Sequence, residues 1–229
     1  MKTISTLMLV VVCFTATLAQ KKEERSVADF NYVSLSTAGK VYVTQGNGYK
    51  VVLEGSNDVL EEVETEVRGS KLVIKKESSG WFNWSSDDDL TVYITMPSIE
   101  GLSVSSSGKI YGQNKFKTDD LRVSVSGSGK VQIQTSSDNV DISISGSGKV
   151  RLEGEAKTVE ASVSGSGDVM ASDFKAKEYS VRISGSGSCE VYAEESIDAR
   201  ISGSGSVHYK GNPRNVNSKT SGSGSVRKI

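Results

Sequence analysis

Two residue types that carry much of protein chemistry are almost missing from this sequence. The 229-residue chain has two cysteines and one histidine. Cys13 lies in the apolar N-terminal stretch, so only Cys189 remains if that stretch is removed, and no internal disulfide can then form. With His208 as the one histidine, a His-rich metal site and a Ser-His-Asp triad would each depend on a single side chain. We therefore predict no metal site, no cofactor and no catalytic residue.

An excess of charge of either sign is also missing. The chain has 27 Lys and Arg residues against 28 Asp and Glu residues. Proteins that bind nucleic acids or anionic membranes usually carry a clustered basic excess. We therefore predict no nucleic-acid partner.

Long apolar runs are absent except at the start of the chain. A short cationic start, an apolar run over residues 7–14 and small residues up to Ala19 are typical of a secretory signal peptide. A membrane anchor needs roughly 20 mostly apolar residues, and serines and threonines interrupt this stretch. A lipoprotein signal would use Cys13, but Val12 stands where the peptidase requires Gly or Ala. We predict a signal peptide at 1–19, a flexible mature N-terminus at 20–27 and no integral membrane segment after cleavage.

The most prominent feature that is present is the repeated tetrapeptide Ser-Gly-Ser-Gly. Its copies follow one another at intervals of 18 to 20 residues, and a worn copy at residues 105–108 precedes them. A period near this length with strand-like residues on both sides indicates a solenoid of stacked coils. The copies stand at Ser126–Gly129, Ser145–Gly148, Ser164–Gly167, Ser184–Gly187, Ser202–Gly205 and Ser221–Gly224.

Apolar residues alternate with polar residues on both sides of each copy, as in half-buried strands. Positions six, four and two before the first glycine are apolar in most copies, for example Val140, Ile142 and Ile144. Cys189 occupies a later inward column, so we expect a buried free thiol, whereas His208 falls in an outward column. The glycines suit a sharp corner where stacked backbones approach closely. We also expect the corner serines to form hydroxyl ladders along the solenoid.

These patterns predict an all-β, right-handed parallel β-helix, with the hand taken from the general chirality preference. We assign one head domain at 28–229, in which 99–229 form the repeat coils and 28–98 form an irregular N-terminal β cap. The cap holds one short helix near residues 59–63, preceded by Ser56, Asn57 and Asp58 as candidate N-caps. The polar residues Ser218 and Thr220 replace apolar ones in the last coil, which we expect to close the C-terminal end.

Two glycine-rich motifs suggest ligand sites but lack the necessary context. Gly127-Ser128-Gly129-Lys130 resembles part of a phosphate-binding loop, yet Val131 starts another strand where that motif requires a helix. Calcium-binding β-rolls place an Asp after the glycines of each repeat. Here Asp168 is the one acid in a column of lysines and serines, so we predict no calcium ladder.

The segment 78–89 is the one stretch that suggests a contact site. It contains both tryptophans of the chain in a polar context, and aromatic side chains on a loop can stack on sugars or anchor an interface. They can equally fold over the cap as a lid. Acidic pairs such as Asp119-Asp120 and Glu194-Glu195 also occur, but we see no acidic set that recurs over neighbouring coils. Our candidate ligand or partner contacts are Trp81, Phe82 and Trp84.

Taken together, several segments resemble one known family. They include the strands at 30–46, the turn at 55–57, the strand end Tyr93-Ile94-Thr95-Met96-Pro97, the Ser-Gly-Ser-Gly copies and the segment 207–213. The sequence is similar here to the putative auto-transporter adhesin head domains (head GIN domain) of secreted Bacteroidetes proteins. The resemblance covers residues 27–229 and implies a secreted β-helical domain that acts in surface adhesion, with no catalytic residues to transfer.

From the residues and the resemblance together we expect an exported, non-catalytic cell-envelope or surface protein, an adhesin or binding scaffold. Its location would be periplasmic, outer-membrane-associated or extracellular, and its partner a glycan or a surface protein. Two alternatives stay open. Polysaccharide-acting enzymes also use β-helices with acidic clusters, and a self-assembling surface structure would use the solenoid ends to form a homo-oligomer.

Overall fold

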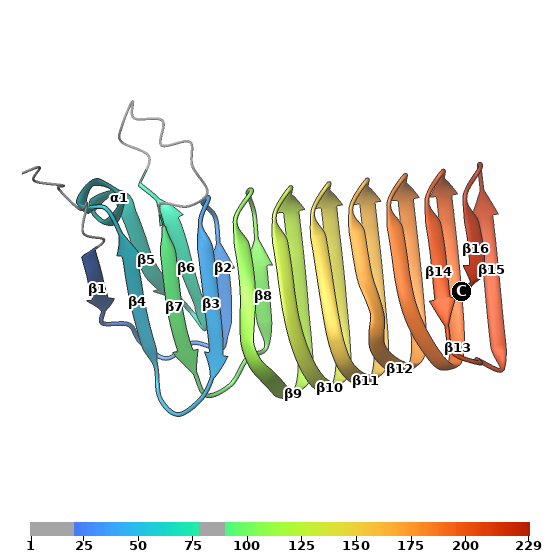
Figure 1. Cartoon of the computed structure of the whole chain (residues 1–229), viewed down its shortest axis with the longest axis horizontal. Helices are drawn as coiled ribbons and strands as arrows, with labels where there is room; N and C mark the ends of the chain where they lie inside the picture. The colour runs from blue at the N-terminus through green and yellow to red at the C-terminus, as the bar shows by residue number, and fades with distance from the viewer. Residues whose placement is uncertain (1–20, 78–89) are drawn as a thin grey trace, which may run out of the picture.

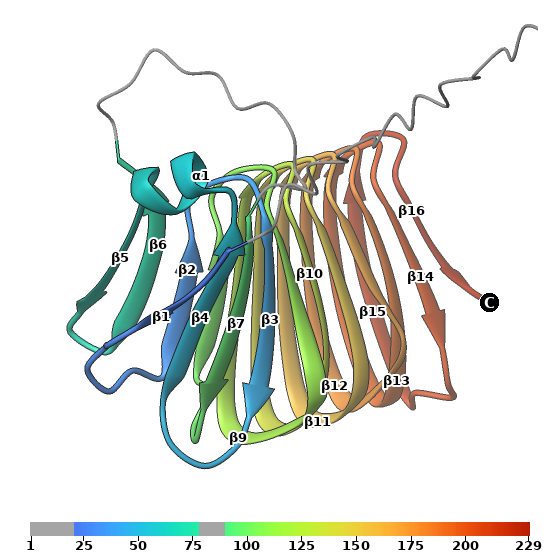
Figure 2. The ribbon, with the colours of Figure 1, turned by 60° about the vertical axis from the view of Figure 1, so that its left-hand side comes forward.

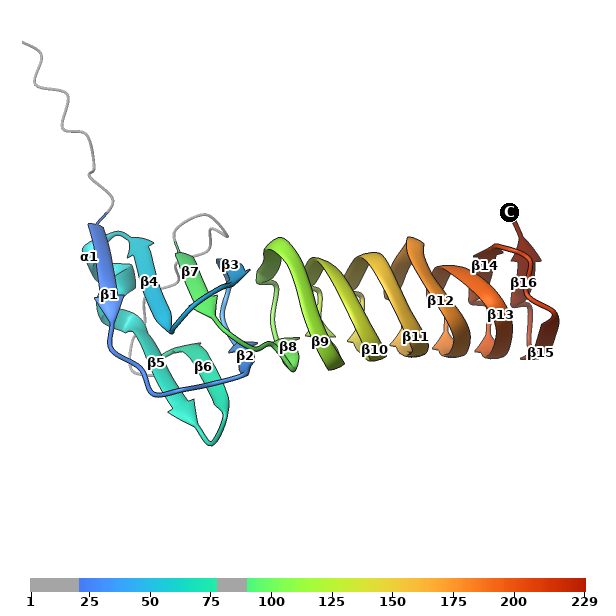
Figure 3. The same ribbon diagram turned by 90° about the horizontal axis from the view of Figure 1, so that it is seen from below.

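The computed structural model describes residues 21–77 and 90–229. It is a β-solenoid of about seven turns, with 74% of its residues in strands and 3% in helix. The coils stack in one row along an elongated molecule, with the N-terminal strands at one end and β15 and β16 at the other (Figures 1 and 3). The predicted parallel β-helix is confirmed. The predicted signal peptide and the candidate contacts Trp81, Phe82 and Trp84 lie outside the described residues.

Five long strands each form most of one coil. Every one bends midway and therefore contributes to two opposite faces of the solenoid (Figure 2). They pair in parallel with equivalent residues side by side, so that Val131 pairs with Val150 and Val140 with Val159. The five are β9 (Lys109–Gly127), β10 (Lys130–Gly146), β11 (Lys149–Gly165), β12 (Asp168–Gly185) and β13 (Ser188–Gly203).

Shorter strands extend the two faces at both ends. We call the face formed by the first halves of β9 to β13 the first face, and the face formed by their second halves the second face. The first face also contains β1 (Lys21–Arg25), β4 (Lys50–Gly55), β7 (Thr91–Met96), β3 (Lys40–Gln45), β14 (Ser206–Lys210) and β16 (Ser225–Lys228). The second face also contains β5 (Val63–Arg68), β6 (Lys71–Lys76), β2 (Tyr32–Leu35), β8 (Gly101–Val104) and β15 (Asn215–Ser221).

The N-terminal region is more regular than the cap we expected. Strands β2 and β3 form one coil and β6 and β7 another, because β2 pairs in parallel with β6 and β8, and β3 with β7 and β9. Only β1, β4, β5 and the helix α1 (Asn57–Glu62) depart from the coil pattern. β4 pairs antiparallel with β7, and β5 pairs antiparallel with β6. These elements form the cap. The Ser56 hydroxyl accepts a hydrogen bond from the Val59 amide, as predicted for the helix start.

Part of the segment 20–27, which we expected to be flexible, is a strand. Within this segment, Lys21–Arg25 form β1, which pairs antiparallel with β4. Ion pairs at Lys22–Glu54 and Lys50–Glu24 join the two strands. The Lys-Lys-Glu-Glu-Arg sequence of β1 contains no apolar residue, so the sequence gave no signal for a strand. Backbone pairing and charges hold β1 in place.

The inward columns form one continuous core. Val140, Ile142, Ile144 and their counterparts are buried, as is the free thiol of Cys189. At the bend between the faces, Phe116 and Phe174 are fully buried. The last coil differs: all residues of β15 are exposed, and Val216 has 47% of its surface accessible. Its polar residues therefore meet water where earlier coils have core.

The Ser-Gly-Ser-Gly corners confirm the need for glycine. Gly146 has a φ of +114°, and a Cβ on this residue would lie 2.7 Å from the Gly127 carbonyl oxygen of the preceding coil. That carbonyl also accepts a hydrogen bond from the Ser147 amide at 2.9 Å. The expected hydroxyl ladders are not found, because within residues 21–77 and 90–229 the hydroxyls of the two corner serine columns make no hydrogen bond with one another. Backbone hydrogen bonds hold these corners instead.

Candidate functional site

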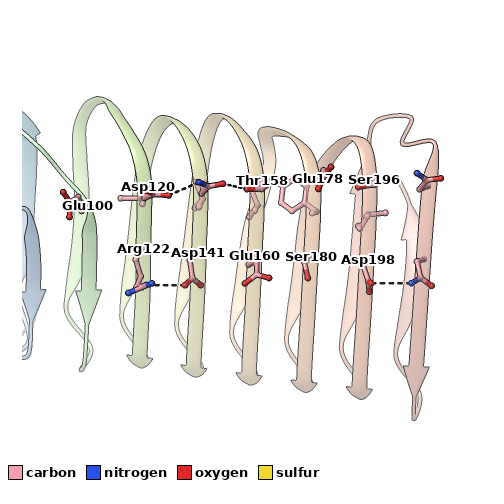
Figure 4. A pocket seen from close by; sticks show the side chains of 18 of the residues that line it. Glu100, Asp120, Arg122, Asp141, Thr158, Glu160, Glu178, Ser180, Ser196 and Asp198 are labelled. Atoms are coloured by element: carbon pink, nitrogen blue, oxygen red, sulfur yellow. Dashed lines mark hydrogen bonds and ion pairs between the residues drawn. The ribbon is translucent and has the colours of Figure 1, made fainter.

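A groove of about 950 Å³ crosses the coils on the second face. Two rows of outward side chains line it, and they lie two residues apart on each strand (Figure 4). Parallel register places the equivalent residues of successive coils side by side. The Asp120 row consists of Asp120, Asn139, Thr158, Glu178, Ser196 and Asn215, and the Arg122 row of Arg122, Asp141, Glu160, Ser180, Asp198 and Asn217.

Side chains of the first three of these coils bind one another. The Asn139 amide donates a hydrogen bond to the Asp120 carboxylate at 2.8 Å, and the Thr158 hydroxyl donates to the Asn139 carbonyl. In the second row, Arg122 pairs with Asp141 at 3.3 Å. Both interactions run along the solenoid axis, as the dashed lines in Figure 4 show. The polar side chains in this part of the groove already have partners within the protein, and their interactions mainly connect neighbouring coils.

The next coils present polar groups of a different kind. No hydrogen bond or ion pair engages the side chains of Glu178, Ser180, Ser196 or Asn215 within the part of the chain that the structure describes. One carboxylate, two hydroxyls and one amide therefore stay available on three successive coils. We take this middle and C-terminal part of the groove as the candidate binding site.

The groove corrects our expectation that no acidic set recurs over neighbouring coils. One carboxylate comes from each of five successive strands. The acids are divided between the two rows, two in the Asp120 row and three in the Arg122 row, so neither position of the repeat is acidic in every coil, and only the folded surface combines them. The acids on these five strands are Asp120, Asp141, Glu160, Glu178 and Asp198, and Glu100, just before β8, also lines the groove. A sum over both positions would have revealed the set in the sequence.

Basic side chains follow on the same face, nearer the corners. Arg182, Arg200 and Lys219 lie in register on three strands and line a smaller hollow of about 350 Å³ together with corner serines. Arg200 pairs with Asp198 at 3.2 Å and Arg182 with Glu160 at 3.8 Å. The groove is therefore acidic in the middle with a basic border toward the C-terminal coils.

Asp168, Cys189 and His208, which the sequence analysis considered as chemical groups, do not line the groove. Asp168 pairs with Lys149 at 3.1 Å, and among the described residues no group of three or more His, Cys, Asp or Glu side chains is placed to hold a metal ion. Burial raises the pKa of the Cys189 thiol to about 12, so the thiol is protonated and unreactive at neutral pH. His208 lies on β14 of the first face beside Glu190, away from the groove.

The segment that holds Trp81, Phe82 and Trp84 connects β6 to β7. β6 ends at Lys76 on the second face, and β7 begins at Thr91 on the first face. The chain returns at Leu90, whose carbonyl accepts a hydrogen bond from the Lys40 amide at 2.9 Å. The contact role of the three aromatic residues stays a prediction.

Within the described residues, no helix is long and apolar enough to cross a membrane.

Comparisons with known proteins identify a family and several solved structures of the same fold. Residues 29–213 match the family described as "Putative auto-transporter adhesin, head GIN domain". A crystal structure of a putative adhesin from Bacteroides fragilis is 25% identical, with a TM-score of 0.86 over 93% of this chain and 98% of that chain. A putative adhesin from Parabacteroides merdae is 18% identical, with a TM-score of 0.72 over 92% and 96% of the two chains.

A putative lipid binding protein from Parabacteroides distasonis is 23% identical, with a TM-score of 0.73 over 92% of this chain and 96% of that chain. At these identities the last two structures support the fold alone. No curated protein matches the chain.

Proposed function

Because the chain belongs to the putative auto-transporter adhesin, head GIN domain family, we propose that it is exported to the cell envelope and binds an extended partner there without catalysis. The observation that carries this proposal is the groove on the second face. Its free polar groups repeat from coil to coil at the strand spacing of about 4.8 Å. Such a surface suits a partner that is itself linear, either a glycan or an extended segment of a surface protein.

The groove can be tested with one substitution and a matched control. Glu178→Arg places a long cation among the free polar groups, whereas Glu194→Arg makes the same charge change at an exposed position of β13 outside the groove. Full-length mature protein and both variants would be applied to a glycan array and to immobilised matrix proteins. We expect Glu178→Arg alone to lose the parent's partners. Equal binding by both variants would contradict the proposal.

Location is a separate requirement of an adhesin. Protease treatment or antibody labelling of intact cells should reach the protein if it is displayed at the surface. A periplasmic marker protein must remain protected in the same cells. Protection of both proteins would leave the groove a binding site but would exclude adhesion.

The five carboxylates favour a polysaccharide-cleaving enzyme as the second candidate, because glycoside hydrolases act through pairs of acids. Incubation with acidic and neutral polysaccharides, followed by an assay for new reducing ends, separates the two functions. Cleavage that is lost in Glu178→Gln and retained in the matched variant Glu194→Gln would establish the enzyme and overturn the non-catalytic proposal.

A further inference from the structure

An aromatic ring lies at the N-terminal end of the groove on the second face. Tyr32 of β2 lines the groove and pairs with Gly101 of β8, which pairs in turn with Arg122. Gly101 therefore stands in line with the Arg122 row, where the following strands have outward side chains. It is nevertheless buried, because the Tyr32 ring lies against it, and a Cβ on Gly101 would collide with that ring. The glycine thus makes room for the ring at the groove surface.

One face of the Tyr32 ring can be reached from solvent. The ammonium of Lys71, an exposed residue of β6, lies over the ring at 4.4 Å from its centroid. A cation at this place marks the negative face of the aromatic ring, and the C–H groups of a sugar ring, which carry small positive charges, are attracted to the same face. Cation–π contacts at exposed sites are weak. A sugar can therefore displace the lysine and stack on Tyr32.

The direction of the groove favours a glycan over a peptide. The groove runs along the solenoid axis and crosses the strands (Figure 4), and the strands beneath it pair with neighbours on both sides. An extended peptide commonly gains affinity from main-chain hydrogen bonds at a free sheet edge, and these inner strands offer none. Only side chains can recognise a partner here. The hydroxyls along a linear glycan can use them, whereas a peptide would leave many of its own amides unpaired.

The charge of the groove narrows the class of glycan. Glu100 lies at the same end as Tyr32, and Glu178 lies among the free polar groups further along. Neither carboxylate takes part in an ion pair within residues 21–77 and 90–229. Carboxylates accept strong hydrogen bonds from hydroxyl groups but repel other acids. The groove therefore suits a chain of uncharged sugars.

We propose that the groove binds a linear polysaccharide without acidic groups, and that Tyr32 stacks on one of its sugar rings. This inference rests on the binding role proposed above for the groove and names its partner. Tyr32 and Glu178 are five strand spacings apart, or about 24 Å. A partner that contacts both residues must extend over at least this length.

Binding of full-length mature protein to immobilised glucomannan, mixed-linkage β-glucan and dextran is measured by biolayer interferometry, with polygalacturonate as the acidic counterpart. We expect a neutral polysaccharide to bind and polygalacturonate to bind more weakly or not at all. A disaccharide should compete poorly, because it cannot reach both ends of the site. If none of the neutral polysaccharides binds, or if polygalacturonate binds as tightly as they do, the glycan assignment is wrong.

Substitutions of Tyr32 test the stacking. Tyr32→Ala should weaken binding of the neutral polysaccharide by about tenfold, whereas Tyr32→Phe keeps the ring and should bind like the parent. Tyr192 is a matched control, since it also lies beneath a lysine, Lys175 at 5.5 Å, but does not line the groove. Tyr192→Ala should bind like the parent. Equal binding by Tyr32→Ala and the parent would overturn the role of the ring.

Two further variants change the position and the accessibility of the ring without removing it. Gly101→Ala should displace the ring and weaken binding as Tyr32→Ala does, with the melting temperature as a check on folding, whereas Lys71→Gln should bind as tightly as the parent or more tightly. Glu178→Arg separates this inference from the groove proposal. If Glu178→Arg loses a matrix protein and no neutral glycan binds the parent, the groove remains a binding site but the glycan assignment fails.

Discussion

At the scale of single residues, the first glycine of each corner adopts a conformation that other residues rarely tolerate. Gly165 has a φ of +112°, and a Cβ there would lie 2.6 Å from the Gly146 carbonyl oxygen. Gly165→Ala should therefore reduce the free energy of unfolding by about 1 to 3 kcal/mol or more. Guanidinium denaturation measures the change.

The same corner offers a control for this prediction. The Ser166 side chain is exposed, and its hydroxyl makes no hydrogen bond within the described residues. Ser166→Ala should change the free energy of unfolding by no more than about 0.5 kcal/mol. Equal effects of the two substitutions would show that the backbone at the corner can relax.

A second residue prediction concerns the buried thiol. Burial, with a smaller contribution from Asp168, raises the pKa of Cys189 to about 12 from an ordinary value of 9.0. The unfolded thiol therefore loses its proton first, and stability falls as pH rises from about 9 to 12. Near the middle of this range Cys189 contributes a loss of up to about 1.4 kcal/mol per pH unit.

Cys189→Val tests this contribution, because valine fills the same column in neighbouring coils, as at Val169 and Val207. Denaturation curves at pH 7 and pH 10.5 should show similar stability for parent and variant at neutral pH, and a smaller alkaline loss for the variant. The other groups that titrate at high pH cancel in the comparison. A parallel alkaline decline would mean that the thiol contributes nothing.

At the scale of elements, β1 protects the edge of the first face at the N-terminal end. It covers the backbone of β4, and the Arg25 guanidinium donates a hydrogen bond to the Leu60 carbonyl of α1 at 2.9 Å. An uncovered strand edge recruits other chains. A mature chain shortened to begin at Val27 should therefore self-associate, as light scattering after gel filtration would show, and β4 amides should exchange faster with deuterium.

Strand pairing and ion pairing at β1 can be separated. Lys22→Ala with Glu24→Ala removes the pairs with Glu54 and Lys50 but leaves the strand intact. Exposed ion pairs contribute little to stability, so this variant should remain monomeric. Association of the substituted chain would assign the protection to the charges rather than to the strand.

At the scale of the whole molecule, the two ends of the solenoid differ. The N-terminal end is covered by α1 and antiparallel strands, whereas β15 and β16 are the last described strands of their faces. Residues 206–229 contain no Asp or Glu and five basic residues: Lys210, Arg214, Lys219, Arg227 and Lys228. Two such ends repel each other, so we expect the protein to be monomeric at neutral pH and low salt.

Removing positive charge from the C-terminal end should allow two such ends to associate. Lys219→Thr with Arg227→Thr keeps strand-forming residues and removes two charges from β15 and β16. Light scattering should then show dimers or longer assemblies, whereas the variant Lys117→Thr with Lys177→Thr should stay monomeric. A parent protein that already assembles end to end at low salt would support the self-assembling alternative.

The repeat made most of the fold predictable. Its period, its alternating columns and its glycine corners are local consequences of one strand–corner unit, so the sequence was sufficient to place Ile142 in the core and Gly146 at a corner. It did not reveal that β2 and β3 form a coil between the β6–β7 coil and β8. The register of strands distant in sequence depends on which edges meet, and no local pattern encodes that choice.

The candidate site likewise depends on which strands distant in sequence become neighbours. The identity of each outward residue was evident from the sequence, but the five groove acids on β9 to β13 are divided between two positions of the repeat. The sequence by itself determined which side chains face water. Only the tertiary structure decided which of them are neighbours, because parallel stacking brings residues from different coils to within one strand spacing.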